Sequence, residues 1–164
     1  MYALIFSDSH GKTYNMQEVI DRQTGAPNAV FFLGDGLRDL DTLGSGRAEL
    51  YCVRGNCDVF SPLEDEEQTV IFDGKKIFMT HGHRYMVKSG YTLAAEKAIK
   101  KGADILLFGH THQPLCLLIR AGARVGDTVA QKDLWIFNPG SVREGCFGTL
   151  TVKNGTILLN NACV

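Results

Sequence analysis

Four of the five histidines in this sequence stand, with two aspartates and an asparagine, in polar loops that directly follow short apolar runs. The seven candidate metal ligands are Asp8, His10, Asp35, Asn56, His81, His110 and His112. His and Asp supply the nitrogen and oxygen ligands that borderline divalent ions prefer. Seven ligands are too many for one tetrahedral ion. They suit two ions that share a carboxylate, an arrangement used in phosphoryl chemistry.

Two of these loops carry ligand candidates two positions apart, as Asp8-Ser9-His10 and His110-Thr111-His112. Side chains at such positions of an extended segment point to the same side. Each pair can therefore direct two ligands to one metal centre or to two neighbouring centres. Each feature alone also fits an ordinary cap, turn or half-buried histidine. Those interpretations do not explain why every candidate follows a strand-like run.

The apolar runs before the loops are too short for helices and predict buried strands. They are Ala3–Phe6, Ala29–Leu33, Leu50–Val53, Ile77–Met79 and Ile105–Phe108. Helical spacing of apolar residues lies between some of them, at Asn15–Gln23 and Ser89–Lys101. The alternation predicts a largely parallel sheet, and ligand sites form at the carboxyl edge of such sheets.

Two dipeptides typical of hairpin turns, Asp73-Gly74 and Asn154-Gly155, add antiparallel strands to this pattern. We therefore predict an α/β fold of two packed mixed β-sheets flanked by helices, an α-β-β-α sandwich. No repeat or linker divides the chain, so residues 1–164 are interpreted as a single domain. The dinuclear metal site is expected at the C-terminal ends of the strands.

Composition excludes several classes of protein. The chain has 164 residues, 45% of them hydrophobic and 21% charged, which is typical of one globular domain and not of disordered or collagen-like chains. A net charge of -1 gives no indication of a basic patch for tight nucleic-acid binding. The N-terminal apolar run lacks a basic segment, and no later run reaches about 18 residues. We expect a cytoplasmic protein with no membrane partner.

The five cysteines are odd in number, widely spaced and without a Cys-x-x-Cys pair, so we expect no disulfide framework and no structural zinc site. Cys52 and Cys116 lie in strand-like runs and are expected to be buried as small hydrophobic residues. Cys57 directly follows the ligand candidate Asn56. It either packs beside the site or takes part in catalysis.

The ordered motifs resemble those of the calcineurin-like metallophosphoesterase superfamily: Asp8-x-His10, Gly34-Asp35, Gly55-Asn56-x-Asp58, His81-Gly82-His83 and Gly109-His110-Thr111-His112. Asn138-Pro139-Gly140-Ser141 looks like the motif that follows in its small bacterial phosphodiesterase branch. The resemblance implies a metal-dependent phosphodiesterase with two divalent ions, usually Mn²⁺. Zn, Fe, Ni and Co are also compatible with His and Asp ligands.

The resemblance also implies a division of the ligands. One ion would be held by Asp8, His10, Asp35 and His112, and the other by Asp35, Asn56, His81 and His110. A metal-bridging hydroxide would attack phosphorus in line. Asn56, Cys57 and His81 are accordingly the catalytic candidates. His83 and Arg54 are the candidates for substrate binding, and a structural hydrogen-bonding role for His83 stays open.

Position 57 departs from the pattern of many larger relatives, which carry a histidine there that is thought to protonate the leaving group. A thiol, with a reference pKa near 8.5, is a poorer proton donor at pH 7. We therefore predict a preference for good leaving groups and little activity on alkyl phosphates.

The charge of the site also bears on the substrate. The charges of two dications, the carboxylates of Asp8 and Asp35 and a hydroxide sum to one positive charge. A diester monoanion balances this charge, whereas a monoester dianion exceeds it.

The expected partner is a small phosphodiester substrate, and nucleic acid enters only as a possible substrate. A phosphomonoesterase is one alternative, since a cation supplied by His83, Arg54, Arg84 or Arg143 would change the charge balance. A non-catalytic protein-binding scaffold is the other. The eukaryotic retromer subunit of this fold works as a scaffold with a degraded ligand set, whereas every ligand position is filled here. The pocket walls are expected from Leu37–Gly46, Phe60–Gln68 and Ala121–Asp133. The last of these is long and is also interpreted as a flap or a contact in a homo-oligomer.

Overall fold

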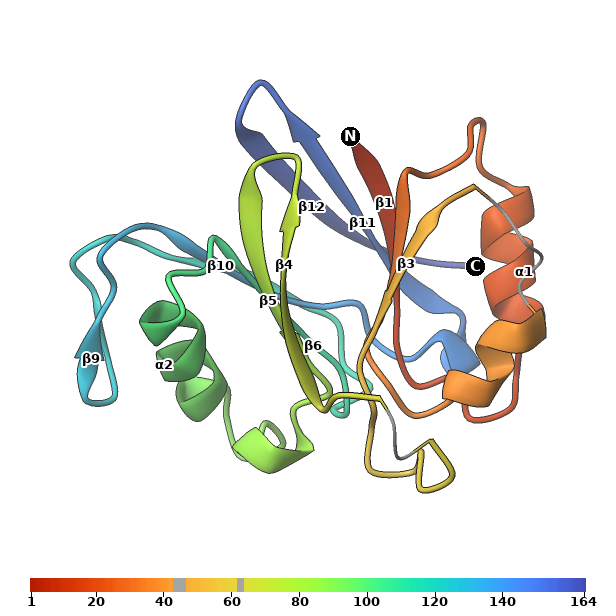
Figure 1. The fold of residues 1–164 in the computed structure, drawn as a ribbon, viewed down its shortest axis with the longest axis horizontal. Helices are drawn as coiled ribbons and strands as arrows, with labels where there is room; N and C mark the ends of the chain where they lie inside the picture. The colour runs from red at the N-terminus through yellow and green to blue at the C-terminus, as the bar shows by residue number, and fades with distance from the viewer. Residues whose placement is uncertain (43–46, 62–63) are drawn as a thin grey trace.

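Two five-stranded β-sheets pack face to face at the centre of the fold, and a helix covers the outer face of each (Figure 1). The computed structural model describes residues 1–42, 47–61 and 64–164. The predicted α-β-β-α sandwich of two mixed sheets is confirmed. No helix in these described ranges is long and apolar enough to cross a membrane.

Each sheet has three parallel strands with antiparallel strands outside them. The first has the order β12 (Thr156–Cys163), β11 (Cys146–Lys153), β1 (Tyr2–Phe6), β2 (Ala29–Phe32) and β3 (Glu49–Cys52). The second has the order β4 (Glu67–Phe72), β5 (Lys75–Thr80), β6 (Ile105–Phe108), β10 (Leu134–Asn138) and β7 (Leu115–Ile119). The parallel strands are β1, β2 and β3 in the first sheet, and β5, β6 and β10 in the second.

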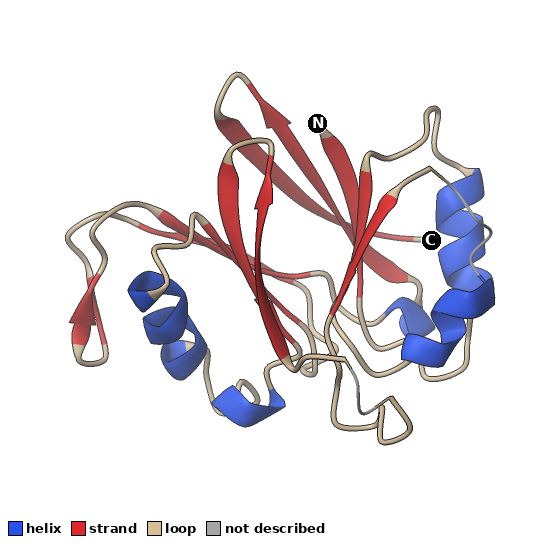
Figure 2. Cartoon of the chain, in the orientation of Figure 1, coloured by secondary structure: helices blue, strands red, loops and turns tan. Residues whose placement is uncertain are grey.

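Helical segments connect these strands, as Figure 2 shows. They are α1 (Tyr14–Asp21), α2 (Thr92–Lys100) and the short 3₁₀ helices η1 (Leu37–Thr42), η2 (His83–Tyr85) and η3 (Val142–Glu144). Both predicted α-helices are present, each slightly shorter than its apolar pattern. The two predicted hairpin turns are also present, with Asp73 and Asn154 at φ of 47° and 50°, as turns favoured by paired strands require.

Burial on both faces explains why β1 is apolar at every position. Ala3 and Ile5 point into the core between the sheets, while Leu4 and Phe6 pack on the outer side with α1. In the second sheet, Leu106 and Phe108 of β6 pack instead with the alanine face of α2. Strands covered on both sides lose the alternation of polar and apolar residues. The resulting continuous apolar runs are the pattern that indicated buried strands.

Two expectations about the cysteines need correction. Cys146 and Cys163 form a disulfide, because the antiparallel register of β11 and β12 places them opposite each other. Cys116 is exposed and Cys52 is only partly buried. Both of these lie on strands at the edge of a sheet, β7 and β3, where neighbouring elements do not cover both faces.

The segment Ala121–Asp133 does not line the predicted site. It forms a two-stranded ribbon, β8 (Arg124–Val125) and β9 (Thr128–Val129), that lies beyond α2 in Figure 1. The backbone N–H of Asp127 donates to Oε1 of Glu96 on α2, at 2.6 Å. The ribbon therefore covers α2, and the prediction of a pocket wall is wrong. A homo-oligomer remains a prediction.

Phe31 tests the assignment of the central core. It is fully buried, stacks on Tyr51 at 5.1 Å between ring centroids, and meets the edge of Phe72 at 5.7 Å. We expect Phe31→Ala to lower the free energy of unfolding by about 3–5 kcal/mol in urea denaturation, because it leaves a cavity. Ile71→Ala, at a side chain 59% exposed on β4, should change it by less than about 0.5 kcal/mol. Equal losses of unfolding free energy in the two variants would contradict the assignment of Phe31 to the central core.

Candidate metal centre

The loops with the predicted ligands gather at one edge of the sandwich, at the carboxyl ends of parallel strands from both sheets (Figure 1). Asp8 and His10 follow β1, and Asp35 follows β2, in the first sheet. His81 follows β5 in the second sheet, and the loop of His110 follows β6. The site is therefore built from two sheets, and neither sheet carries it alone.

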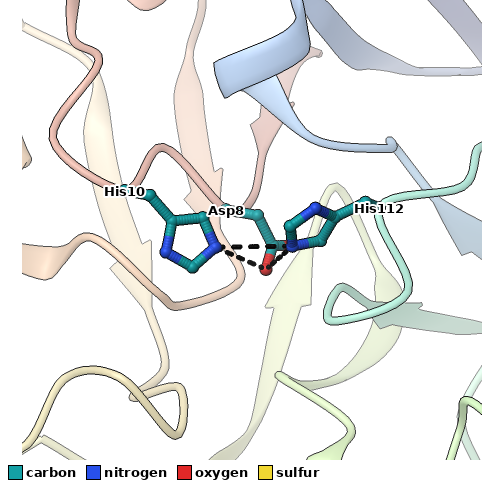
Figure 3. A group of neighbouring side chains, drawn as sticks. All are labelled: Asp8, His10 and His112. Atoms are coloured by element: carbon teal, nitrogen blue, oxygen red, sulfur yellow. Dashed lines mark hydrogen bonds and ion pairs between the residues drawn. The ribbon is translucent and has the colours of Figure 1, made fainter.

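One group of three side chains consists of Asp8, His10 and His112 (Figure 3). The Nε2 atoms of His112 and His10 lie 3.2 Å and 3.7 Å from Oδ1 of Asp8. The two Nε2 atoms are 3.4 Å apart. A carboxylate oxygen facing two imidazole nitrogens at these distances is an arrangement that one cation can join.

A second group consists of Asp35, His81 and His110. Nε2 of His81 lies 3.3 Å from Oδ2 of Asp35 and 3.1 Å from Nδ1 of His110. The two groups adjoin, because Nε2 of His10 is 3.9 Å from the same Oδ2 of Asp35. Asp35 therefore lies between the groups, where a shared carboxylate would have to be.

Asp8 provides an observation on whether a cation fits. Its carboxylate is fully buried, and Oδ2 accepts hydrogen bonds from Oγ of Ser7 at 2.5 Å and from the N–H of His110 at 3.0 Å. Oδ1 is buried without a hydrogen-bond partner among the described residues. A buried carboxylate oxygen without a partner is costly. Because it faces only imidazole nitrogens, the donor set fits a divalent metal ion.

The tautomer of His81 is fixed by the backbone. Its Nδ1 lies 2.7 Å from the carbonyl oxygen of Leu33, which can only accept, so Nδ1 donates and Nε2 faces the carboxylates. Burial alone would lower the pKa of His81, but the contacts with Asp35 and Asp8 outweigh it and raise the pKa. Burial, together with a charge on His81, lowers the pKa of His110 to about 4. A proton is thus favoured on His81 and disfavoured on His110.

Strained backbone is concentrated in these loops. Five predicted ligands have positive φ angles: Asp8 at 57°, His10 at 45°, Asp35 at 59°, His110 at 66° and His112 at 60°. Non-glycine residues rarely adopt this left-handed conformation, which costs about 1 kcal/mol or more each. Such strain clusters at functional sites, where the surrounding structure holds it. Here it turns each side chain into the edge between the sheets.

Asp58 has a positioning role that the sequence did not reveal. Its buried carboxylate accepts four backbone hydrogen bonds, from Asp35 and Gly55 at Oδ2 and from Gly36 and Leu37 at Oδ1, at 2.7–2.9 Å. It therefore ties the loop after β2 to the loop after β3. The Gly-Asn-x-Asp motif contained this residue, but nothing in the sequence showed which backbone groups it would contact.

The same two loops approach so closely that one position excludes any side chain. A Cβ atom on Gly55 would overlap Oδ1 of Asp35. Farther along the edge, Asn138 donates to the carbonyl oxygen of Gly109 at 2.8 Å, and Ser141 donates to that of Asp8 at 2.8 Å. The Asn-Pro-Gly-Ser segment therefore positions the loops that follow β6 and β1.

Cys57 and Asn56 lie at the exposed side of the cluster. The N–H of Cys57 donates to Oδ1 of Asp35 at 2.7 Å, and its thiol lies in a group with His10 and Asp35. Desolvation and the Asp35 carboxylate raise the pKa of the thiol to about 11. The amide of Asn56 donates to Sγ of Cys57 at 3.3 Å. Among the described contacts, none joins Asn56 to the other predicted ligands.

Arg54 and His83, the predicted substrate-binding residues, both face Glu66. Arg54 donates to Oε1 of Glu66 at 2.8 Å, and Nε2 of His83 lies 3.9 Å from the same atom. Arg84 also donates to Glu66, at 2.8 Å and 3.1 Å. The hydrogen bond from Arg84 lowers the pKa of Glu66. Both arginines are therefore ion-paired with this carboxylate.

Comparisons with known proteins identify the family. The profile of the calcineurin-like phosphoesterase superfamily domain matches residues 1–157. The chain is 32% identical over 143 residues to the probable metallophosphoesterase YsnB of Bacillus subtilis, covering 87% of this chain and 76% of that protein. It is 28% identical over 167 residues to the phosphodiesterase YfcE of Escherichia coli, covering 87% and 80%.

Solved structures support the same assignment. A predicted phosphoesterase from Streptococcus pneumoniae superposes with a TM-score of 0.76 at 27% identity, covering 99% of this chain and 88% of that one. Vps29 of Entamoeba histolytica, in a structure with zinc, gives 0.73 at 21% identity, covering 99% of each chain, and shares the fold. The chain belongs to the calcineurin-like phosphoesterase superfamily. It is a metal-dependent phosphoesterase.

Asp58 gives a prediction about this centre. We expect Asp58→Asn to weaken divalent metal binding about 10- to 100-fold, the usual loss when a residue that supports ligands is changed. The amide cannot accept all four backbone hydrogen bonds, so the loop of Asp35 would lose its position. Titration with Mn²⁺ by calorimetry measures the effect. Asp65→Asn, at an exposed carboxylate, is the matched control. Unchanged affinity in Asp58→Asn would refute the positioning role.

Proposed function

We propose that this chain is a phosphodiesterase that works with two divalent metal ions, Mn²⁺ in the first place, held by the seven predicted ligands. The observation that carries the proposal is the adjacency of two His-and-Asp groups, one around the unpartnered Oδ1 of Asp8 and one around Asp35. The phosphodiesterase name of the Escherichia coli relative supports the reaction class.

For six of the seven ligands, the contacts support the division that the resemblance implies. The first ion belongs with Asp8, His10 and His112, and the second with His81 and His110. Asn56 joins the second ion on the resemblance alone. Asp35 is the shared ligand, since its Oδ2 lies within 3.9 Å of Nε2 in both His10 and His81. Its other oxygen is held by the N–H of Cys57, which fixes the carboxylate between the groups.

When bound, two such ions supply an ionised water as nucleophile and neutralise charge on the phosphoryl oxygens. The residues of this chain orient the ligands for that chemistry. His81 keeps Nε2 directed at the centre through its bond to Leu33, and Asp58 fixes the loop of Asp35. Arg54 and Arg84 both form ion pairs with Glu66. Their positive charges are therefore less available to balance the second negative charge of a phosphate monoester. The pairing of these two arginines supports a diester substrate.

Hydrolysis of aryl esters tests this function. We expect the Mn²⁺-loaded protein to hydrolyse bis(p-nitrophenyl) phosphate with kcat/KM at least tenfold above that for p-nitrophenyl phosphate. Asp35→Asn should reduce turnover of the diester at least 100-fold and bind fewer metal ions by elemental analysis, because the shared carboxylate is lost. A preference for the monoester would indicate a phosphomonoesterase. No turnover with Mn, Co, Ni or Zn would favour a protein-binding scaffold.

Cys57 carries a separate prediction about the leaving group. A thiol donates a proton less readily than imidazolium near neutral pH, so with Cys57 at this position the leaving group would depart without strong assistance. We expect Cys57→His to raise kcat on methyl phenyl phosphate more than tenfold and on the nitrophenyl diester by less than threefold. Cys57→Ser controls for the change of side chain. No gain on the poorer leaving group would contradict a role for this position in proton donation.

A further inference from the structure

A hollow of about 190 Å³ opens directly beside the metal centre. Its lining includes His10, Asp35 and Cys57, which belong to the cluster. It also includes Arg38 of η1 and Phe60 of the loop after β3. A substrate with its phosphorus at the metals would extend a substituent into this hollow. The wall formed by Arg38 and Phe60 therefore meets the part of the substrate beyond the phosphate.

Phe60 and Arg38 form a stacked pair in that wall. The guanidinium carbon of Arg38 lies 4.6 Å from the centroid of the Phe60 ring, within the range of a cation–π contact. Phe60 is nevertheless 74% exposed, so most of its ring is uncovered. A single exposed apolar side chain is ordinary. Phe60 differs because a cation orients its ring and because it lines a hollow shared with the metal centre.

The charges around the hollow leave Arg38 available. Among the described residues it forms no ion pair, whereas Arg54 and Arg84 are both bound to Glu66. The acidic side chains of the hollow are committed to loop contacts. Asp58 accepts hydrogen bonds from four backbone N–H groups. Asp39 accepts hydrogen bonds from Oγ of Ser9 and from the N–H of Gly11. The wall thus offers a planar cation and an aromatic face.

We propose that Arg38 and Phe60 form a subsite for a planar aromatic substituent of the substrate, such as a nucleobase or an aryl ring. This inference deepens the proposed function and rests on it. The aromatic group stacks on the face of Phe60 that Arg38 does not cover, and the guanidinium holds that ring in place. Stacking of a base on an aromatic side chain strengthens binding roughly 5- to 100-fold.

Binding of two phosphate monoesters tests the subsite without requiring turnover. AMP and ribose 5-phosphate share the sugar phosphate and differ by the base, and calorimetry on the full chain with Mn²⁺ gives both affinities. We expect AMP to bind about 5- to 100-fold more tightly to the wild type. Phe60→Leu should bring this ratio close to 1 with ribose 5-phosphate binding unchanged, and Phe60→Tyr should retain the ratio. Arg38→Gln should lower it at least threefold.

Val59→Ala is the matched control, because Val59 is a neighbouring side chain, 67% exposed, that does not line the hollow. It should leave the ratio unchanged. Equal binding of AMP and ribose 5-phosphate to the wild type, or an unchanged ratio in Phe60→Leu, would overturn the subsite. If the nitrophenyl diester is still hydrolysed, only the subsite is wrong. A base-dependent ratio without any turnover would retain the subsite and refute the phosphodiesterase.

Discussion

Two buried carboxylates, Asp8 and Asp35, impose the main electrostatic constraint on this molecule. Burying a carboxylate without compensation is strongly unfavourable. One oxygen of each is satisfied by hydrogen bonds, while Oδ1 of Asp8 and Oδ2 of Asp35 face imidazole nitrogens. The cluster therefore needs positive charge at its centre. Asp35 and Asp8 raise the pKa of His81, and a bound divalent ion would supply the same positive charge with this histidine deprotonated.

Support for this cluster comes mainly from residues that do not face the metals. Asp58 holds the loop of Asp35 through backbone N–H groups, and Ser141 holds the loop of Asp8 through its carbonyl oxygen. These contacts also explain how the left-handed backbone at five ligand positions is maintained. The loops that contain these residues are held by hydrogen bonds to neighbouring segments of the chain.

The sequence allowed prediction of the fold class because its strongest signals are local. Apolar runs such as Ala3–Phe6 and the turn Asp73-Gly74 specify their structure within a few residues. The ligand candidates were found because each follows a strand. Arg38 and Phe60 lie in segments that were predicted as pocket walls. Their mutual contact, the role of Asp58 and the disulfide were missed because they depend on contacts between segments distant in sequence. The same reason explains Cys116, whose exposure depends on its strand being at a sheet edge.

Strand β1 is the middle strand of its sheet, yet one of its two neighbours, β11, begins more than a hundred residues later in the chain. During synthesis on the ribosome, one side of β1 therefore stays without its hydrogen-bonding partner until almost the whole domain has emerged. An unpaired apolar strand of this kind invites pairing with other chains. This topology makes the nascent chain dependent on shielding by other parts of itself or by a chaperone for most of its translation.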